Sequence, residues 1–416
     1  MNKQLRKIQI LFLAPCISLA ALLWVAKSNW ISIAAAQVSR NAAVPRTPLV
    51  FDKAPVRVVE DANPSFNAIA MDSDDSEVLI SNNNKASTPS ILVYPTEFKT
   101  TDRVMEPKRR IGGPTAHLGD ICGIAVSPQN KEIYTVQGEE PEMKVFPLDG
   151  NGDMDAARSL KVAHGSADVY LDSKNDELFI TTEHINKITV YKRSARGSDK
   201  PVRFIQGPHT QIADPHGLYV DSDSNELFVT NYGSWRETAS DEDVESRASD
   251  REEAALPLAA STGKFVPPSI GVYSRTAQGD AAPLRVIQGA HTQLNLPLGV
   301  ARDPVTGQIV VANSGGDSVL FFDAKASGDV APVRVLKGAA TNLKSPTGVL
   351  VDTKRNELWV TSWGNHTTNV FPRTAQGNMA PVRYIRSAPK DAPPATFGTP
   401  GAVAWDPQRK EILVPN

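Results

Sequence analysis

This chain of 416 residues has few cysteines and little excess charge of either sign, and it lacks the short motifs of several enzyme classes. The two cysteines are Cys16 and Cys122, so removal of an N-terminal segment would leave one thiol and no internal disulfide. Cys122 precedes a glycine at the start of an expected strand, which favours a buried, inert thiol over a nucleophile. A nucleophile elbow, a Walker loop, a paired-cysteine zinc pattern and HExxH are all absent. These absences count against several enzyme classes but leave lyase or lactonase chemistry on loops open.

The charge balance gives the chain no basic field. Its formal net charge is -2 and its pI is near 6.4, so nucleic acid is not an expected partner. The hydrophobic content of 41% is enough for a large core, and 31 prolines with 27 glycines indicate many turns. This composition favours an all-β repeat fold.

The N-terminal segment differs from the rest and predicts export. Lys3, Arg6 and Lys7 precede an apolar run at residues 8–26, and an alanine triplet at 34–36 offers a small-residue cleavage site. We therefore interpret residues 1–47 as an export signal with a linker, which predicts a periplasmic or extracellular protein. The run is also long enough to cross a bilayer, so an uncleaved N-terminal anchor is the alternative and the one expected route to a membrane.

A repeated phrase fixes the expected architecture. Its clearest copy is at residues 332–383, and it recurs about every 49 residues. Each unit contains four short apolar segments bounded by Gly, Pro, Asn and Asp, which is typical of a four-stranded propeller blade. The second segment of each unit begins, in chain order, at Glu77, Glu132, Glu177, Glu226, Gln308, Glu357 and Glu411.

That count predicts an all-β, seven-bladed propeller over residues 48–416, with six blades as the alternative. The last unit stops after its second segment, and residues 49–55 match a third-strand phrase. We therefore expect an N-terminal strand to complete the last blade and close the ring, which would remove free sheet edges. An acidic insertion at 235–267 interrupts the fourth unit; it is expected to be mobile, as a tolerated insertion or, alternatively, a partner-binding arm.

Residues 215–231 read PHGLYVD and then NELFVTN, residues 346–361 contain PTG and then NELWVT, and residues 375–383 read AQGNMAPVR. These phrases resemble the NHL-type repeats of bacterial exported propellers across roughly residues 48–416. The resemblance implies the propeller fold, in a family whose rings are often six-bladed. It leaves function open, because this scaffold hosts lyases, lactonases and binding proteins.

A ring of uncharged polar residues is expected where the second strands end. Amides and hydroxyls around the upper mouth of the channel could bind a sugar, water or a hard cation. The alternative is that these residues only cap tight turns, which a repeated sequence would also repeat. The candidate ligand-binding residues are Asn82, Gln137, Thr182, Asn231, Asn313 and Ser362, with Asn416 in the last unit and Trp363 and His366 beside Ser362.

Departures from the repeat are the better guide to a specific site. His216 is the one imidazole at the position that precedes the first strand of each unit, and Glu183 with His184 follows Thr182 in the third unit. Two histidines and a carboxylate could act as acid and base or hold a metal. The plain alternative is a loop histidine, since His209 and His291 occupy equivalent places in two units.

Two further patterns concern charges. The loop at 149–155 imitates a calcium loop, but Met154 and Leu160 occupy places where an EF-hand needs Gly and Glu, which favours an ordinary turn. We therefore predict no cofactor and keep a divalent cation as an alternative. The recurring Glu of the second strand and the recurring Arg of the fourth are expected to form ion pairs, within or between blades.

These observations lead to two main hypotheses, and a surface-assembly component tethered by the N-terminal segment is a third. The first is an exported propeller that serves as a binding or scaffold module and presents its upper face to a small polar ligand, a glycan or a protein. The second is an enzyme that resembles streptogramin lyases or the SMP-30/gluconolactonase-type hydrolases, with its active site at the channel mouth. There His216, Glu183 and His184 would be the acid and base, and Asn82, Asn231 and Asn313 the metal or substrate ligands.

Overall fold

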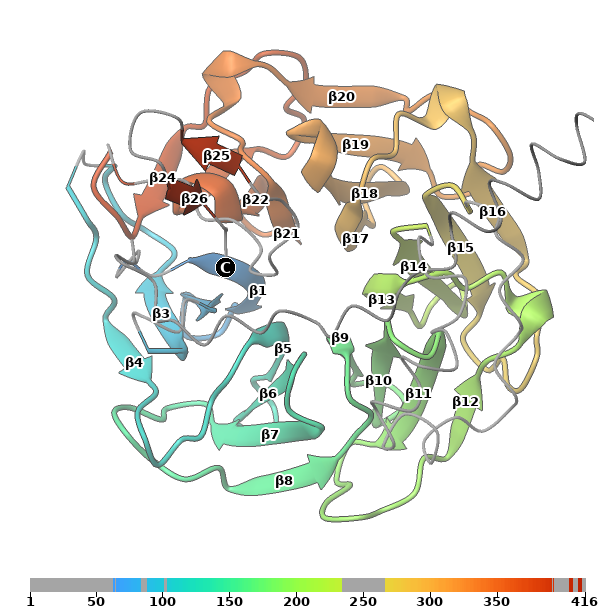
Figure 1. Cartoon of the computed structure of the whole chain (residues 1–416), viewed down its shortest axis with the longest axis horizontal. Coiled ribbons are helices and arrows are strands. Elements are labelled where there is room, and N and C mark those ends of the chain that lie inside the picture. The colour runs from blue at the N-terminus through green and yellow to red at the C-terminus, as the bar shows by residue number, and fades with distance from the viewer. Residues whose placement is uncertain are drawn as a thin grey trace, which may run out of the picture. The chain divides into compact units, whose positions relative to one another are not determined.

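The computed structural model describes residues 63, 65–83, 88–100, 103–233, 266–390, 392, 404–406 and 411–413. These residues belong to one compact unit, Glu60–Asn416. The regular elements in it are strands and single-turn 3-10 helices (Figure 1). No helix among the described residues has both the length and the apolar character needed to cross a membrane. The expected export segment, residues 1–47, lies outside the described residues.

Six four-stranded antiparallel sheets form the blades of a β-propeller (Figure 1). In each sheet the spatial order of the strands follows the chain, from an inner first strand to an outer fourth strand. Blades 1 to 3 consist of β1 (Phe66–Asp72), β2 (Glu77–Asn82), β3 (Ser90–Pro95), β4 (Arg109–Ile111), β5 (Ile121–Ser127), β6 (Glu132–Gln137), β7 (Glu142–Pro147), β8 (Arg158–Lys161), β9 (Ser166–Asp172), β10 (Glu177–Thr182), β11 (Lys187–Lys192) and β12 (Arg203–Ile205).

Blades 4 to 6 repeat the arrangement, with 3-10 turns in their loops. Their strands are β13 (Pro215–Asp221), β14 (Glu226–Asn231), β15 (Ser269–Ser274), β16 (Arg285–Gln288), β17 (Pro297–Asp303), β18 (Gln308–Asn313), β19 (Ser318–Asp323), β20 (Arg334–Lys337), β21 (Pro346–Asp352), β22 (Glu357–Ser362), β23 (Thr367–Pro372) and β24 (Arg383–Arg386). The 3-10 turns are η2 (Pro208–Thr210), η3 (Ala290–Thr292), η4 (Ser314–Gly316), η5 (Ala339–Thr341) and η6 (Trp363–Asn365).

In blades 4 and 6, an Asp before the turn and an Asn at its end form the hairpin between the first two strands. In blade 4, Asp221 Oδ1 accepts the backbone N–H groups of Asp223 and Ser224 at 3.0 and 3.3 Å. Asn225 then closes the turn with φ of 56°, in the left-handed region that Asn tolerates. Asp352 and Asn356 repeat the geometry in blade 6, which explains why Asp and Asn bracket the turns of the repeat.

The core lies between the blades. A cluster of buried apolar side chains fills each of the six joints between neighbouring sheets, the joint between blades 6 and 1 included. At that joint Trp359 of β22 is fully buried in the same cluster as Phe66 of β1 and Tyr94 of β3. Burial of such side chains on both faces of a sheet explains the continuous apolar runs in the second strands.

The prediction of seven blades is wrong, and the six-blade alternative is correct. The inner strands contact one another in sequence, and β21 of blade 6 contacts β1 of blade 1. Thr347 Oγ1 and Thr361 Oγ1 both donate to Asn67 O across this joint, at 3.0 and 2.6 Å. The described residues of blades 6 and 1 therefore close the ring directly.

The miscount came from the terminal half-repeat. Its strands, β25 (Ala404–Asp406) and β26 (Glu411–Leu413), pair with each other as a separate two-stranded sheet. Residues 49–55, expected to supply a closing strand, lie outside the described residues. Most of the 235–267 insertion does as well, in the connection between β14 and β15, where the described chain stops at residue 233 and resumes at 266.

The expected ion pairs are confirmed and lie within blades. Arg203 at the start of β12 contacts both carboxylate oxygens of Glu177 on β10, at 2.6 and 2.8 Å. Its guanidinium also donates to Arg275 O of blade 4 at 3.0 Å. The other blades repeat the pair, with Gln308 in place of Glu in blade 5. Each repeated Arg therefore joins its own blade to the next one.

Candidate functional site

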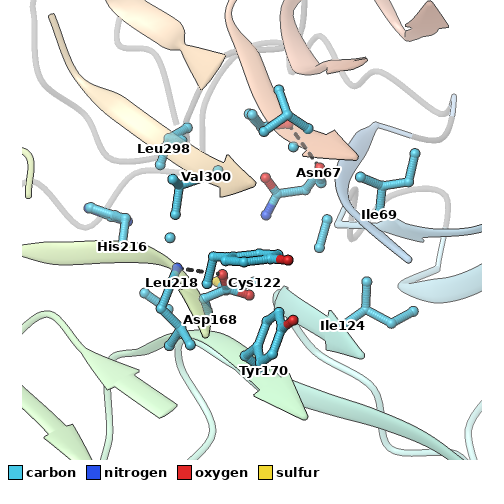
Figure 2. Close-up of a pocket in the computed structure, with 18 of the residues that line it drawn as sticks. Asn67, Ile69, Cys122, Ile124, Asp168, Tyr170, His216, Leu218, Leu298 and Val300 are labelled. Atoms are coloured by element: carbon cyan, nitrogen blue, oxygen red, sulfur yellow. Dashed lines mark hydrogen bonds between the residues drawn. The ribbon is translucent and has the colours of Figure 1, made fainter. Parts of the chain in front are cut away.

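The six inner strands surround a cavity of about 1060 Å³ in the channel of the propeller. Each of these strands has a register irregularity near its first residue, where it pairs with the second strand of its blade. The second residue of each inner strand lines the cavity at this point (Figure 2). Those six residues are Asn67, Cys122, Ala167, His216, Leu298 and Thr347.

The third residue is small in five of the six inner strands, because neighbouring strands approach one another closely. A Cβ on Gly217 would lie 2.4 Å from Leu298 O of the next blade, and one on Gly299 would lie 2.6 Å from Thr347 O. Asp168 occupies this position in β9, where the other inner strands have Gly or Ala. Blade 3 therefore places a carboxylate where the ring otherwise has no side chain larger than methyl.

Asp168 is held by backbone groups of two blades. Its Oδ2 accepts the N–H of Leu218 on β13 at 3.0 Å, and its Oδ1 accepts the N–H of Val169 at 2.8 Å (Figure 2). Burial raises the pKa of Asp168 to about 7, although these two hydrogen bonds and nearby His216 act in the opposite direction. The carboxyl group therefore changes charge near neutral pH.

His216 lies between two carboxylates. Its Nε2 is 3.4 Å from Asp214 Oδ1 and 3.5 Å from Glu183 Oε2, and we call these three residues the rim cluster. Glu183 follows β10 directly, and Asp214 precedes β13, so the cluster spans the joint between blades 3 and 4. Burial alone would lower the pKa of His216, but Asp214 and Glu183 outweigh it and raise that pKa above its ordinary value.

A surrounding shell orients the rim cluster. The ring of Tyr232 lies against that of His216, with centroids 3.7 Å apart, and Asn186 Oδ1 accepts the N–H of Asp214 at 2.8 Å. His184 Nε2 is 3.1 Å from Glu183 Oε1. The Nδ1 of His184 is in turn 2.9 Å from Nδ1 of His164, which extends the imidazole and carboxylate contacts along the rim.

The rim cluster also has the composition of a metal site. One ligand atom from each of Glu183, Asp214 and His216 can be chosen so that all three lie within 4.8 Å of one another. Among the described residues this is the group of His, Cys, Asp and Glu side chains that is compact enough to share one ion. Two carboxylates and an imidazole suit a divalent cation such as Zn²⁺.

The remaining walls of the cavity are largely apolar. Ile69 and Ile124 line it from blades 1 and 2, across from His216, and Leu298 and Val300 line it from blade 5, beside His216 (Figure 2). Tyr170 of β9 also lines it and contacts Tyr219 edge to face, with ring centroids 5.1 Å apart. Asp120 and Glu139 add carboxylates from blade 2, whereas the imidazoles of the lining, with Asp168 and the rim cluster, come from blades 3 and 4.

The structure brings together the three candidates for acid and base chemistry. His216, Glu183 and His184 all line the cavity, and Glu183 contacts both histidines. His209 and His291, treated as plain repeat residues, lie outside its lining and contact Asp280 and Asp329 at 2.6 and 2.7 Å. The geometry is that of a shared site, and the catalytic role stays a prediction.

The expected ring of polar ligands does not line the cavity. Its described members are buried at or just after the ends of the second strands, where six of them pair with the first residues of the inner strands, and several bind nearby loops. Asn416 lies outside the described residues. Asn82 Oδ1 accepts Ser65 N at 2.9 Å, Asn313 Oδ1 accepts Asn295 N at 2.6 Å, and Asn231 Oδ1 accepts Ala213 N at 3.2 Å. The residues placed in this way are Asn82, Gln137, Thr182, Asn231, Asn313, Ser362, Trp363 and His366. These contacts fit turn capping, and ligand binding by them stays a prediction.

Of three further cavity residues, one behaves as the sequence predicted and two were missed by the sequence analysis. Burial raises the pKa of the Cys122 thiol far above its ordinary range, as expected for an inert cysteine. Asp168 and Asp214 were missed. The signal for Asp168 was available, since it is the charged residue in a column otherwise made of Gly and Ala. Asp214 carried no comparable signal, because Asp120 occupies the equivalent place in blade 2.

Comparisons with known proteins bear on the fold. No family model matches the chain, and no curated protein matches it. Among solved structures it is similar to hydrazine synthase of Kuenenia stuttgartiensis, with a TM-score of 0.51 and 13% identity, over 87% of this chain and 98% of that chain. A nidogen/laminin complex gives a TM-score of 0.39 and 14% identity, over 80% of this chain and 84% of that chain. The likeness to the first of these shows a β-propeller fold, and the NHL-type repeat stays a prediction.

Proposed function

We propose that this propeller is a binding protein that takes one small polar ligand at the mouth of its channel. A propeller supports a binding or scaffold role in general terms. The observation that carries the finer proposal is the cavity of about 1060 Å³, with acidic groups from blades 2 to 4, imidazoles from blades 3 and 4, and aliphatic side chains from blades 1, 2 and 5. Its volume is close to that of small-molecule sites, roughly 300–1,000 Å³.

The chemistry of the walls narrows the ligand class. Glu183 and Asp214 accept hydrogen bonds and favour positive charge, so they suit a ligand with hydroxyl or ammonium groups. The aliphatic wall of Ile69, Ile124 and Val300 suits the carbon skeleton of the same ligand. A sugar unit of a glycan or an amino compound meets both requirements. Export of the protein is part of the proposal and rests on residues 1–47.

A ligand panel tests this proposal. Sugars, sugar acids, amino acids and polyamines would be screened by saturation-transfer NMR and by thermal shift against the purified protein. Leu298→Trp should abolish binding of any hit, since Leu298 lines the cavity and is 9% exposed. Val382→Trp, at a position 60% exposed and outside that lining, should leave binding unchanged. Hits that bind the Leu298→Trp variant as tightly as the parent would refute the channel site.

Hydrolase or lyase activity is the second candidate, favoured by Asp168. A carboxyl group with a pKa of about 7 beside an imidazole is suited to general base or acid catalysis at neutral pH. In a lactone-opening reaction Asp168 would take the proton of the attacking water. A panel of lactones followed by pH-stat should then show turnover that Asp168→Asn removes and His291→Ala preserves. Absence of turnover, or turnover retained by Asp168→Asn, would exclude this role for Asp168.

A further inference from the structure

We propose that Glu183, Asp214 and His216 form a binding site for one divalent transition-metal cation, with Zn²⁺ preferred. This inference rests on the proposed channel site and deepens it by naming the group that would contact the ligand. It stands on three observations: the spacing of the three side chains, the state of the His216 Nε2 atom, and the contacts behind the carboxylates.

Two of the three separations within the rim cluster match those of ligands around a shared ion, and the third is no more than 4.8 Å. Zinc lies at about 2.0–2.2 Å from imidazole nitrogens and carboxylate oxygens, so two ligands of a tetrahedral site are about 3.3–3.6 Å apart. His216 Nε2 lies 3.4 Å from Asp214 Oδ1 and 3.5 Å from Glu183 Oε2. Both values fall in that interval.

The second observation concerns the His216 Nε2 atom itself. It is buried, and its nearest acceptors in the described part of the chain are the two carboxylates, at 3.4 and 3.5 Å, which is long for a hydrogen bond. Contacts of this length satisfy a buried imidazole nitrogen only weakly. A cation between the three side chains would satisfy that nitrogen and would neutralise the two carboxylates together.

The third observation is a supporting shell of the kind that metal ligands require. The second oxygen of Glu183 lies 3.1 Å from His184 Nε2. The ring of His216 lies against Tyr232, and the backbone of Asp214 is fixed by Asn186. Such contacts hold first-shell ligands in one orientation and commonly change metal affinity about 10- to 100-fold. With three protein ligands, a tetrahedral ion would keep one position for a polar group of the ligand.

Zinc titration of the EDTA-treated, dialysed protein tests the site. Isothermal calorimetry should give one Zn²⁺ per chain, and mass spectrometry of metals should find the same stoichiometry after gel filtration. His216→Ala, Asp214→Asn and Glu183→Gln should each weaken binding at least about 10-fold. His291→Ala is the matched control, because His291 also contacts a carboxylate, Asp329, but lies outside the cavity lining.

The experiment distinguishes failure of the metal site from failure of the proposed channel function. Variants are compared only if their thermal unfolding stays cooperative, and Asp214→Asn and Glu183→Gln preserve side-chain shape in case His216→Ala fails to fold. Absence of Zn²⁺ binding, equal binding by all folded variants, or an equal loss in His291→Ala would overturn the metal site. Panel ligands that bind in EDTA to a protein that takes up no Zn²⁺ would overturn it too and leave the proposed channel function standing. Zinc bound at the cluster without any panel ligand would sustain the metal site and count against that function.

Discussion

The carboxylate of Asp168 accepts the backbone N–H of Leu218 from the neighbouring inner strand at 3.0 Å. One side chain thus links blades 3 and 4 and also titrates, because burial raises its pKa to about 7. In the other blades the same position is occupied by Gly or Ala and carries no charge. The joint between blades 3 and 4 therefore couples stability to pH.

Replacing Asp168 with Asn should change how stability depends on pH. An unfolded aspartate ionises near 3.8, whereas folded Asp168 keeps its proton up to about 7, so the native state binds the extra proton between these values. Stability from this group therefore falls as pH rises through that interval. Asp168→Asn keeps an acceptor for Leu218 N and never ionises. Its Tm should rise relative to the parent by at least about 2 °C between pH 4 and pH 7.

The control for this experiment is the difference in Tm between the parent and Asp168→Asn, measured in EDTA at each pH. His216 also has a raised pKa, so its contribution is present below 6.5 and is lost as pH rises through its folded pKa. Both proteins contain His216, so subtracting one Tm curve from the other removes the effect of His216 on stability at first order. A Tm difference between parent and variant that stays constant across this range would show that Asp168 ionises normally.

Thr361 should be needed for the inner seam between blades 6 and 1. Its hydroxyl donates to Asn67 O at 2.6 Å and accepts Gly348 N at 2.8 Å, and the residue is fully buried. Thr361→Val keeps the shape but leaves both backbone groups without this partner, which should cost about 1–3 kcal/mol of unfolding free energy. Thr361→Ser keeps the hydroxyl and should lose less. Urea denaturation measures both losses, and an unchanged free energy of unfolding in Thr361→Val would show that these two hydrogen bonds do not stabilise the seam.

The Arg383–Glu357 pair should show coupling in a double-mutant cycle. Arg383 contacts both carboxylate oxygens at 2.6 and 2.7 Å, and also donates to Thr96 O of blade 1 at 2.9 Å. Arg383→Gln, Glu357→Gln and the double variant should give a coupling energy of about 0.5–3 kcal/mol by urea denaturation. Blade 5 supplies the comparison, where Arg334 meets neutral Gln308 at 3.0 Å and coupling should be smaller. Strictly additive losses at Arg383 and Glu357 would remove the ion pair as a stabilising contact.

A chain that ends at Lys390 should still fold. Blades 6 and 1 contact each other directly, and β25 and β26 pair only with each other among the described strands. We therefore expect one cooperative unfolding transition with a Tm within about 3 °C of the full chain. Loss of folding on this truncation would mean that residues 391–416 help to close the ring, contrary to six blades.

The sequence was sufficient to predict the structure of one blade but not the number of blades in the ring. The Asp and Asn turns, the four strands and the Glu–Arg pairs were all predictable, because each is set by residues within one repeat. The number of blades was not, because closure depends on contacts such as Thr361 with Asn67, which are 294 residues apart. A half-repeat near the C-terminus has the same local signals as a blade, and only long-range contacts tell them apart.

The candidate site was predictable where it breaks the repeat. His216 and Glu183 stand out as departures from their columns, and the structure places them 3.5 Å apart. The polar residues at the ends of the second strands follow the repeat. The side chains of Asn82, Asn231 and Asn313 accept hydrogen bonds from loop N–H groups. Asp214 could not be singled out, since its part in the rim cluster follows from the way blade 4 packs against blade 3.

The seam between blades 6 and 1 also has a consequence for synthesis of the protein. The bond from Arg383 to Thr96 O spans 287 residues of the chain. At roughly 5–20 residues per second, a ribosome needs about 15–60 s to make that stretch. During this time the apolar side chains of Phe66 and Tyr94 in blade 1 are not yet covered by Trp359 and its neighbours in blade 6. Nascent chains should therefore expose one apolar flank until the last blade emerges, which makes this flank the natural target for a chaperone.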